Sequence, residues 1–219
     1  MGKIPFFTKE QRLIFDQVKN EPLLRDKFYF TGGTALSSVY FRHRYSEDMD
    51  FFSENKFDYE EILSIVNLWT SKLNFTFKSQ FKEVVSIFYL TFKNKQELKV
   101  DFGYYPYERV EKVNTIDGVS IDSMMDIAVN KLMTIHQRSS EKDFVDLYFL
   151  LKHYTIWDLM EGVRIKFRRE IEPWILGADF LYAADQFKSL PKMIKPLTLG
   201  ELKRFYRNLG MNLAKKAVE

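Results

Sequence analysis

The sequence predicts an α+β fold, in which a mixed or antiparallel sheet with flanking helices is followed by a helical C-terminal half. Before residue 116, aromatic-rich extended segments occur together with segments in which apolar residues recur at helical spacing. From Ile121 onward, apolar residues recur mainly with the helical period. Hydrophobic residues make up 46% of the 219 residues and aromatic residues 16%, which is enough apolar material for a packed core.

Residue patterns in the first half of the sequence predict a succession of helices and strands. Thr8 and Gln11 have the spacing of a capping box, and apolar residues follow at helical spacing from Ile14. Pro22 is expected to end this helix. The predicted elements, in chain order, are a helix over 8–20, a strand over 27–31, a helix over 34–42, a strand over 48–52, a helix over 59–72, and strands over 75–78, 84–92 and 98–104.

Apolar spacing in the second half of the sequence predicts helices. Apolar stripes with helical spacing run through residues 125–136 and 144–151. Asp117-Gly118 is typical of a turn near the junction, and no long linker rich in Pro, Gly or Ser separates the halves, so we expect them to pack as one body. The predicted division is a core over 1–116 and a helical region over 117–219 that packs on it.

Composition excludes several classes of protein. The absence of Cys removes disulfides, Cys-ligated zinc and thiol nucleophiles, and suits a reducing cytosol, so we expect a cytoplasmic protein. The three His residues lack metal-binding spacing, and no Walker A, Gly-x-Gly-x-x-Gly or Gly-x-Ser-x-Gly motif occurs. No apolar run is long enough for a membrane span. The 33 basic and 30 acidic residues give a net charge of +3, which argues against a uniformly basic nucleic-acid binder.

Two carboxylates lie two positions apart in a predicted strand. Asp48 and Asp50 flank Met49, and because strand side chains alternate between faces, both carboxylates are expected on one face. Two neighbouring anions repel unless water or a cation such as Mg²⁺ compensates them. Asp101, on the polar face of the strand over 98–104, adds a third carboxylate, and three can hold metals for nucleotidyl transfer. The alternative is a solvated strand end or an Asx turn at the Asp-x-Asp pair.

A Gly-Gly turn precedes these carboxylates. Gly32 and Gly33 follow a predicted strand and open a predicted helix. Glycines let a backbone approach a phosphate closely, and the N–H groups of a helix N-terminus carry partial positive charge. The Thr34 hydroxyl adds one more hydrogen-bonding group. A tight turn needs no ligand, so the motif alone leaves a structural and a functional interpretation open.

The order of these motifs resembles that of the polymerase-beta-like nucleotidyltransferase superfamily. Within it, the segments GGTAL at 32–36 and RYSEDMDFF at 44–52 resemble the AbiEii-type nucleotidyltransferases, toxins of bacterial abortive-infection toxin–antitoxin systems. A second block is similar to that family's helical motifs: it contains Lys131-Leu132, then Arg138, then KDFVDLY at 142–148. The resemblance covers residues 28–152 and implies a nucleotidyltransferase-like core.

The resemblance implies roles for individual residues. Asp48, Asp50 and Asp101 would hold Mg²⁺, or alternatively Mn²⁺, and Asp101 would also help to deprotonate an attacking hydroxyl. Lys131 and Asp146 complete the implied catalytic set. The implied nucleotide-binding residues are Gly32, Gly33, Thr34, Ser46, Lys131 and Arg138.

The second block, residues 131–148, which we call the helical block, leaves alternatives open. Lys131 and Arg138 are seven residues apart on a predicted helix, so they share a face and can clamp phosphates, although Lys131 is equally an ordinary solvated lysine. Asp143 and Asp146 also share a face and can orient either cation, or Asp146 can form a surface pair with Lys142. Arg44 is expected to support the loop that carries the Asp-x-Asp pair.

Basic residues concentrate near the C-terminus. Residues 188–219 contain eight Lys and Arg against two Glu, and a second cluster comprises Arg164, Lys166, Arg168 and Arg169. Such stripes are usually solvated helix faces, but they can also bind the phosphates of an RNA such as tRNA.

Three functions remain for this sequence. The first is a Mg²⁺-dependent nucleotidyltransferase that moves a nucleoside monophosphate from an NTP to an acceptor, tRNA or another RNA, as the toxin of a pair with a cognate antitoxin. The second is a non-catalytic module on the same scaffold that binds nucleotide, RNA or a protein partner. The third is transfer to a small molecule, against which the basic C-terminal segment argues mildly.

Overall fold

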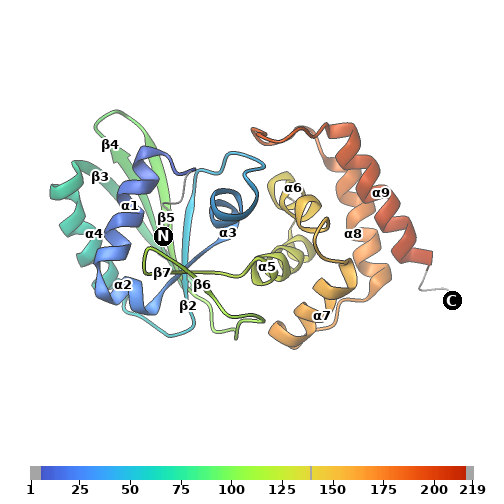
Figure 1. Ribbon diagram of the computed structural model, residues 1–219, viewed down its shortest axis with the longest axis horizontal. Coiled ribbons are helices and arrows are strands. Elements are labelled where there is room, and N and C mark those ends of the chain that lie inside the picture. The colour runs from blue at the N-terminus through green and yellow to red at the C-terminus, as the bar shows by residue number, and fades with distance from the viewer. Residues whose placement is uncertain (1–5, 139, 216–219) are drawn as a thin grey trace. The chain divides into compact units, whose positions relative to one another are not determined.

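The computed structural model describes residues 6–138 and 140–215, which form two compact units (Figure 1). Unit 1 comprises the chain up to Tyr40, Ser46–Glu108 and Lys112–Ser123. Unit 2 comprises Phe41–Tyr45, Arg109–Glu111 and the chain from Met124 onward. Two short segments of the first half therefore belong to the helical unit, and residues 117–123 belong to the sheet unit. The packing of a helical region on the core stays a prediction.

Unit 1 is built on a mixed sheet of seven strands within the described residues, in the order β3-β4-β5-β2-β1-β7-β6. β2 runs parallel to β5 and antiparallel to β1, and β7 runs parallel to β1. The strands are β1 (Tyr29–Thr31), β2 (Met49–Ser53), β3 (Phe75–Lys82), β4 (Val85–Phe92), β5 (Glu97–Tyr104), β6 (Asn114–Ile116) and β7 (Val119–Ile121). The helices are α1 (Lys9–Asn20), α2 (Pro22–Lys27), α3 (Gly32–Ala35), the π-helix η1 (Leu36–Phe41) and α4 (Tyr59–Leu73).

One face of this sheet carries the apolar core of unit 1. Strand pairing places Phe30, Phe51 and Phe102 in one row across β1, β2 and β5, and all three are fully buried. Phe15 of α1 packs on Phe30 with ring centroids 5.8 Å apart. Because side chains alternate along a strand, the residues next to these phenylalanines point to the opposite face of the sheet, where the polar residues of the candidate site lie.

The structure confirms most predicted elements of the first half and adds three short ones. At the start of α1, the Thr8 hydroxyl accepts the Gln11 N–H at 3.1 Å and the Gln11 side chain accepts the Thr8 N–H at 3.0 Å, so the capping box is present. Pro22 also begins α2, in a first-turn position where a missing N–H is harmless. The sequence patterns did not reveal β6 and β7, three residues each, on either side of Asp117-Gly118. Strands this short carry little periodicity.

Unit 2 is helical, and its core centres on Tyr206. The Tyr206 ring packs against Phe144 and Phe180 at centroid distances of 5.0 and 5.1 Å, and its hydroxyl donates to the Phe144 carbonyl oxygen at 2.7 Å. The helices are α5 (Met124–Gln137), α6 (Glu141–Leu150), α7 (Ile156–Phe167), α8 (Pro173–Gln186) and α9 (Leu199–Lys215). Across the described ranges, each helix is too short or too polar to span a membrane.

A buried ion pair holds the segment Arg109–Glu111 within unit 2. Asp126 accepts hydrogen bonds from the Lys166 ammonium at 2.6 Å and from the N–H groups of Val110 and Glu111 at 2.9 and 3.0 Å. Burial alone would raise the pKa of Asp126, but Lys166 and the backbone donors hold the pKa below its ordinary value. Because the Lys166 side chain is fully buried, its predicted place in a surface basic cluster is wrong.

The helices α8 and α9 approach each other closely at two glycines. A Cβ atom on Gly210 would lie 2.7 Å from the carbonyl oxygen of Gly177, and a Cβ on Gly177 would lie 2.8 Å from that of Gly210. Both backbones are part of helices, so neither carbonyl can move without disturbing a turn. Glycine at these positions therefore sets the distance between the two helices.

We expect Gly210→Ala to lower the free energy of unfolding by about 1–3 kcal/mol, because the added methyl group separates α8 from α9. Gly200→Ala is the matched control, since Gly200 lies in the same helix with open space around its Cβ position. Thermal melting followed by circular dichroism would measure both variants. Equal melting temperatures for the two would contradict the close packing.

Candidate active site

The Gly-Gly turn packs directly on a carboxylate of the Asp-x-Asp pair. β1 and β2 pair so that Thr31 lies opposite Asp50. Gly32 follows with a φ of 75°, and a Cβ atom on it would lie 2.2 Å from Oδ2 of Asp50. Glycine is therefore needed here both for its backbone conformation and for the space that the carboxylate fills. The turn was predicted from the sequence, whereas its contact with Asp50 depends on strand pairing.

Hydrogen bonds within unit 1 fix the loop that carries Asp48. Thr34 is 1% exposed, and its hydroxyl donates to the carbonyl oxygen of Asp48 and lies 2.9 Å from the hydroxyl oxygen of Ser46. The Gln11 amide of α1 donates to the carbonyl oxygens of Ser46 and Glu47 at 2.9 and 3.3 Å. Thr34 and Ser46 thus position Asp48 through these bonds, and their contacts with nucleotide phosphates stay predictions.

The three predicted carboxylates share one nearby lysine. Asp50 and Asp101 are direct neighbours in the parallel pair of β2 and β5, and the Lys99 ammonium, from the same face of β5, forms an ion pair with Asp101. Burial raises the pKa of Asp101, and Asp48 adds to this rise while Lys99 opposes it. Burial alone would lower the pKa of Lys99, but Asp101, Asp50 and Asp48 raise the pKa above its ordinary value.

The donors at this site suit a hard divalent cation. Among the described residues, Oδ1 of Asp101 is buried without a hydrogen-bond partner, which leaves one carboxylate oxygen for a cation. Hard divalent cations prefer such oxygen ligands. No three Asp, Glu, His or Cys side chains in the described ranges already form a metal-binding group. In the present arrangement Lys99 supplies the positive charge.

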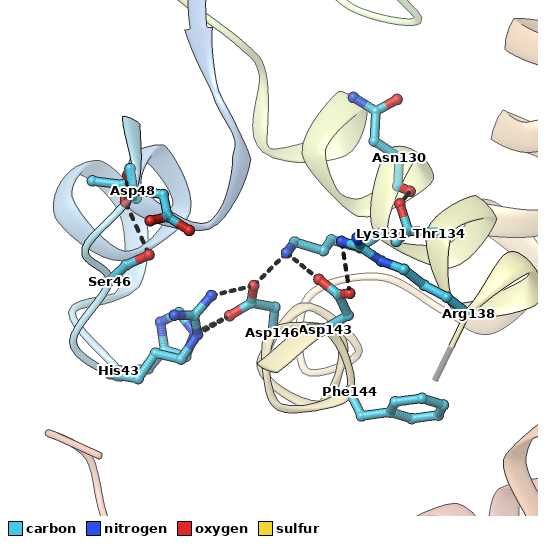
Figure 2. A network of polar contacts seen from close by, with 12 residues as sticks. His43, Ser46, Asp48, Asn130, Lys131, Thr134, Arg138, Asp143, Phe144 and Asp146 are labelled. Carbon is cyan, nitrogen blue, oxygen red and sulfur yellow. Dashed lines mark hydrogen bonds and ion pairs between the residues drawn. The ribbon is translucent and has the colours of Figure 1, made fainter. Parts of the chain in front are cut away.

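Unit 2 contains a second buried cluster of charges, with Asp146 at its centre (Figure 2). The Asp146 side chain is 0% exposed and accepts hydrogen bonds from two nitrogens of the Arg44 guanidinium at 2.6 and 2.8 Å. The Lys131 ammonium lies 2.7 Å from an oxygen of Asp146 and 2.7 Å from an oxygen of Asp143. Two cations and two carboxylates therefore compensate each other.

Electrostatic coupling fixes the ionisation of this cluster. Burial alone would raise the pKa of Asp146, but Lys131 and Arg44 hold the pKa far below its ordinary value. Burial alone would lower the pKa of Lys131, but Asp146 and Asp143 raise it. Burial lowers the pKa of His43 while Asp146 opposes this effect, and Nε2–H donates to the ionised Asp146 carboxylate across 2.7 Å.

These contacts decide between the alternatives for the helical block. Asp143 and Asp146 orient Lys131 by ion pairs, as the shared helix face predicted. A solvated Lys131 is wrong, because its side chain is 12% exposed, and a surface pair of Lys142 with Asp146 is wrong because Asp146 is fully buried. Arg138 is 70% exposed and lies 3.4 Å from Asp143. Phosphate binding by Lys131 and Arg138, and catalysis by Asp146, stay predictions.

Sequence reasoning missed two residues of these clusters. Lys99 carried a usable signal, because the strand period places it on the face of Asp101. His43 had none, since its partner Asp146 is 103 residues away in the chain. Arg44 was expected to support the Asp-x-Asp loop, and the structure shows its guanidinium bound to Asp146.

The mixed sheet, the Gly-Gly turn against Asp50 and the neighbouring Asp101 define a nucleotidyltransferase fold, and comparison with known proteins agrees. JHP933 from Helicobacter pylori is 25% identical, with a TM-score of 0.59 over 96% of this chain and 94% of that chain. MenT4, a nucleotidyltransferase toxin from Mycobacterium tuberculosis, shares the fold at 16% identity, with a TM-score of 0.55 over 93% of this chain and 83% of that chain. An uncharacterized protein of Aquifex aeolicus is 34% identical over 195 residues, which are 86% of this chain and 88% of that protein.

Residues 14–206 match the family described as nucleotidyl transferase AbiEii toxin of type IV toxin–antitoxin systems. The chain therefore belongs to the AbiEii nucleotidyltransferase toxin family, and it is a transferase. This confirms the resemblance drawn from GGTAL, RYSEDMDFF and KDFVDLY, as well as the predicted α+β nucleotidyltransferase-like fold. The family suggests a nucleotide substrate and an antitoxin partner.

We expect Asp146→Asn to lower the free energy of unfolding by about 3–5 kcal/mol, because it leaves Arg44 and Lys131 buried without the charge that compensates them. Asp185→Asn is the matched control, since Asp185 forms an ion pair with Arg207 in which both side chains are more than half exposed, worth about 0–1 kcal/mol. Urea unfolding at pH 7 would measure both. An equal loss in the two variants would contradict the central role of Asp146.

We also expect Asp146→Asn to change how the free energy of unfolding depends on pH. The depressed pKa of Asp146 in the folded chain gives stability that is present above its unfolded-state pKa of about 3.9 and is lost as the pH falls toward the folded-state pKa. The free energy of unfolding should therefore fall less steeply below about pH 4 in Asp146→Asn than in the wild type. Parallel profiles would show that Asp146 does not cause the loss.

Proposed function

We propose that this chain transfers a nucleoside monophosphate from an NTP to a hydroxyl group of an RNA acceptor, such as tRNA, in a reaction that requires Mg²⁺ or Mn²⁺. The observation that supports it most strongly is the adjacency of Asp50 and Asp101 on β2 and β5, with the backbone of Gly32 packed on Asp50. Nucleotide chemistry follows from the family. The metal follows from the carboxylate donors and the buried, unpartnered oxygen of Asp101 within the described chain.

The proposed reaction is an in-line displacement at phosphorus. The acceptor oxygen forms a bond to the α-phosphorus, the bond from that phosphorus to the bridging oxygen breaks, and pyrophosphate leaves. Asp48, Asp50 and Asp101 would hold the metal, which supplies neutralisation of the triphosphate charge when bound. Asp101 would also accept the hydroxyl proton, the role that the resemblance to the family implies for it. The backbone at Gly32 and Gly33 has no Cβ atoms to keep phosphate oxygens away.

The basic face of α9 supports an RNA acceptor. Leu202 and Tyr206 are buried on one side of this helix, and Arg204 and Arg207 are exposed. Arg207 pairs with Asp185, but its own side chain is 51% exposed, so the guanidinium remains accessible. Contacts of this kind bind phosphates without regard to sequence and weaken as salt rises.

We expect Asp48→Asn and Asp50→Asn each to reduce transfer of label from radioactive NTPs to total RNA by about 100-fold or more, since each removes one charged metal ligand. Asp26→Asn is the control, because Asp26 is 61% exposed and pairs with its neighbour Arg25. Full transfer by the Asp48 and Asp50 variants would overturn the mechanism. Nucleotide binding that is indifferent to metal, without transfer, would favour the non-catalytic module, and label found only on small molecules would favour the third function.

We expect Lys99→Met to bind Mn²⁺ roughly 10-fold more tightly, because it removes a positive charge from the proposed metal ligands. Lys72→Met, an exposed position at the end of α4, is the matched control. Titration of free Mn²⁺ by electron paramagnetic resonance gives the dissociation constant without any turnover. Unchanged or weaker binding in Lys99→Met would show that Lys99 does not compete with the metal.

A further inference from the structure

A groove lies on the polar face of the sheet in unit 1. Its volume is about 570 Å³, and strands β3, β4 and β5 form its floor. Asp48 and Lys99, which belong to the candidate active site, also line it. Pockets of about 300–1,000 Å³ accommodate small organic ligands, so this groove has room for a nucleoside.

Strand register places an aromatic ring between two lysines in this groove. Tyr89 of β4 lies opposite Lys78 of β3 on one side and Lys99 of β5 on the other, and paired residues point to the same face. Tyr89 is 45% exposed and Lys78 is also exposed. The next row on this face pairs Ile87 with Asp101. Tyr89 is therefore one strand and one row from Asp101, about 8 Å between Cα atoms.

The side chains of the groove suit a nucleoside better than a polyphosphate. Lys78 and Lys99 are balanced by the carboxylates of Glu47, Asp48 and Glu97, so the groove has no excess positive charge. Carboxylates repel phosphates, but they accept hydrogen bonds from hydroxyl and amino groups such as those of ribose and the bases. An exposed tyrosine ring gives any base a surface on which to stack.

We propose that this groove binds the 3′-terminal nucleoside of a single-stranded RNA acceptor, an inference that rests on the proposed function. The base stacks on Tyr89, Lys78 binds the phosphate that joins the terminal nucleoside to the preceding one, and Glu97 accepts a ribose hydroxyl. β5 provides both the floor of the groove and Asp101. An RNA end held in the groove therefore directs its terminal hydroxyl toward Asp101, the proposed proton acceptor. The NTP phosphates belong to the other side of the carboxylates, at Gly32.

Anisotropy of a 5′-fluorescein single-stranded oligoribonucleotide, titrated with protein in Mg²⁺ without NTP, tests this inference. We expect Tyr89→Ala to raise the dissociation constant 5- to 150-fold, the range that corresponds to loss of one stacked base. Tyr89→Phe keeps the ring and should bind like the wild type, as should the control Tyr182→Ala, an aromatic residue of unit 2 that is 63% exposed. Lys78→Ala should weaken binding and reduce its salt dependence by about one phosphate contact.

The outcomes separate the groove from the proposed function. Unchanged oligonucleotide binding by Tyr89→Ala, in a protein whose thermal melt matches the wild type, overturns the groove assignment. If Tyr89→Ala raises the KM for the NTP and leaves the RNA affinity unchanged, the groove assignment is also overturned, because the groove would then hold the base of the NTP. Binding that depends on Tyr89 in a wild type that transfers no label supports the groove and contradicts the nucleotidyltransferase proposal alone.

Discussion

Compensation of crowded carboxylates is the constraint on which the rest of this structure depends. In unit 1, strand pairing sets Asp50 beside Asp101, and the Lys99 ammonium bound to Asp101 reduces their repulsion. In unit 2, Asp146 and Asp143 are buried and Lys131 binds both of them. The arrangement in unit 2 would not tolerate burial without its cations, because an unpaired ion in an apolar interior costs several kcal/mol. The two clusters differ in their hydrogen bonding, since Oδ1 of Asp101 in unit 1 is buried without a hydrogen-bond partner among the described residues, while the Asp146 carboxylate is fully engaged by Arg44, Lys131 and His43.

The backbone around the carboxylates limits how they can move. Gly32 allows the turn after β1 to contact Asp50, and Thr34 fixes the Asp48 backbone by a hydrogen bond. Such restraint favours catalysis by positioning and charge stabilisation, which is the chemistry that nucleotidyl transfer requires from a protein. The groove over β3, β4 and β5 extends the same face of the sheet, so one surface combines the carboxylates with the exposed ring of Tyr89.

Periodicity in the sequence predicted the long elements well. Helix α1 with its capping box, helix α4, and strands β4 and β5 have enough residues for their apolar spacing to be recognised, whereas the strand predicted over 75–78 covers only the first half of β3. The short elements α2, β6 and β7 escaped, because three to six residues hardly establish a period. Candidate residues such as Asp48, Asp50 and Asp101 were identified from residue type, spacing and family resemblance, whereas Lys99 was missed although it shares the face of Asp101.

The sequence by itself determined the α+β class, the family and the set of carboxylates, because these depend on local patterns of residue type and spacing. Only the tertiary structure decided which partners those residues have. Asp146 binds Arg44 and His43, which are more than a hundred residues away in the chain. Lys166 was predicted in a basic surface cluster, but it is buried and forms an ion pair with Asp126. A buried charge needs a counter-ion, and the counter-ion can come from any part of the chain that the fold brings close. Local sequence patterns therefore do not predict such pairs.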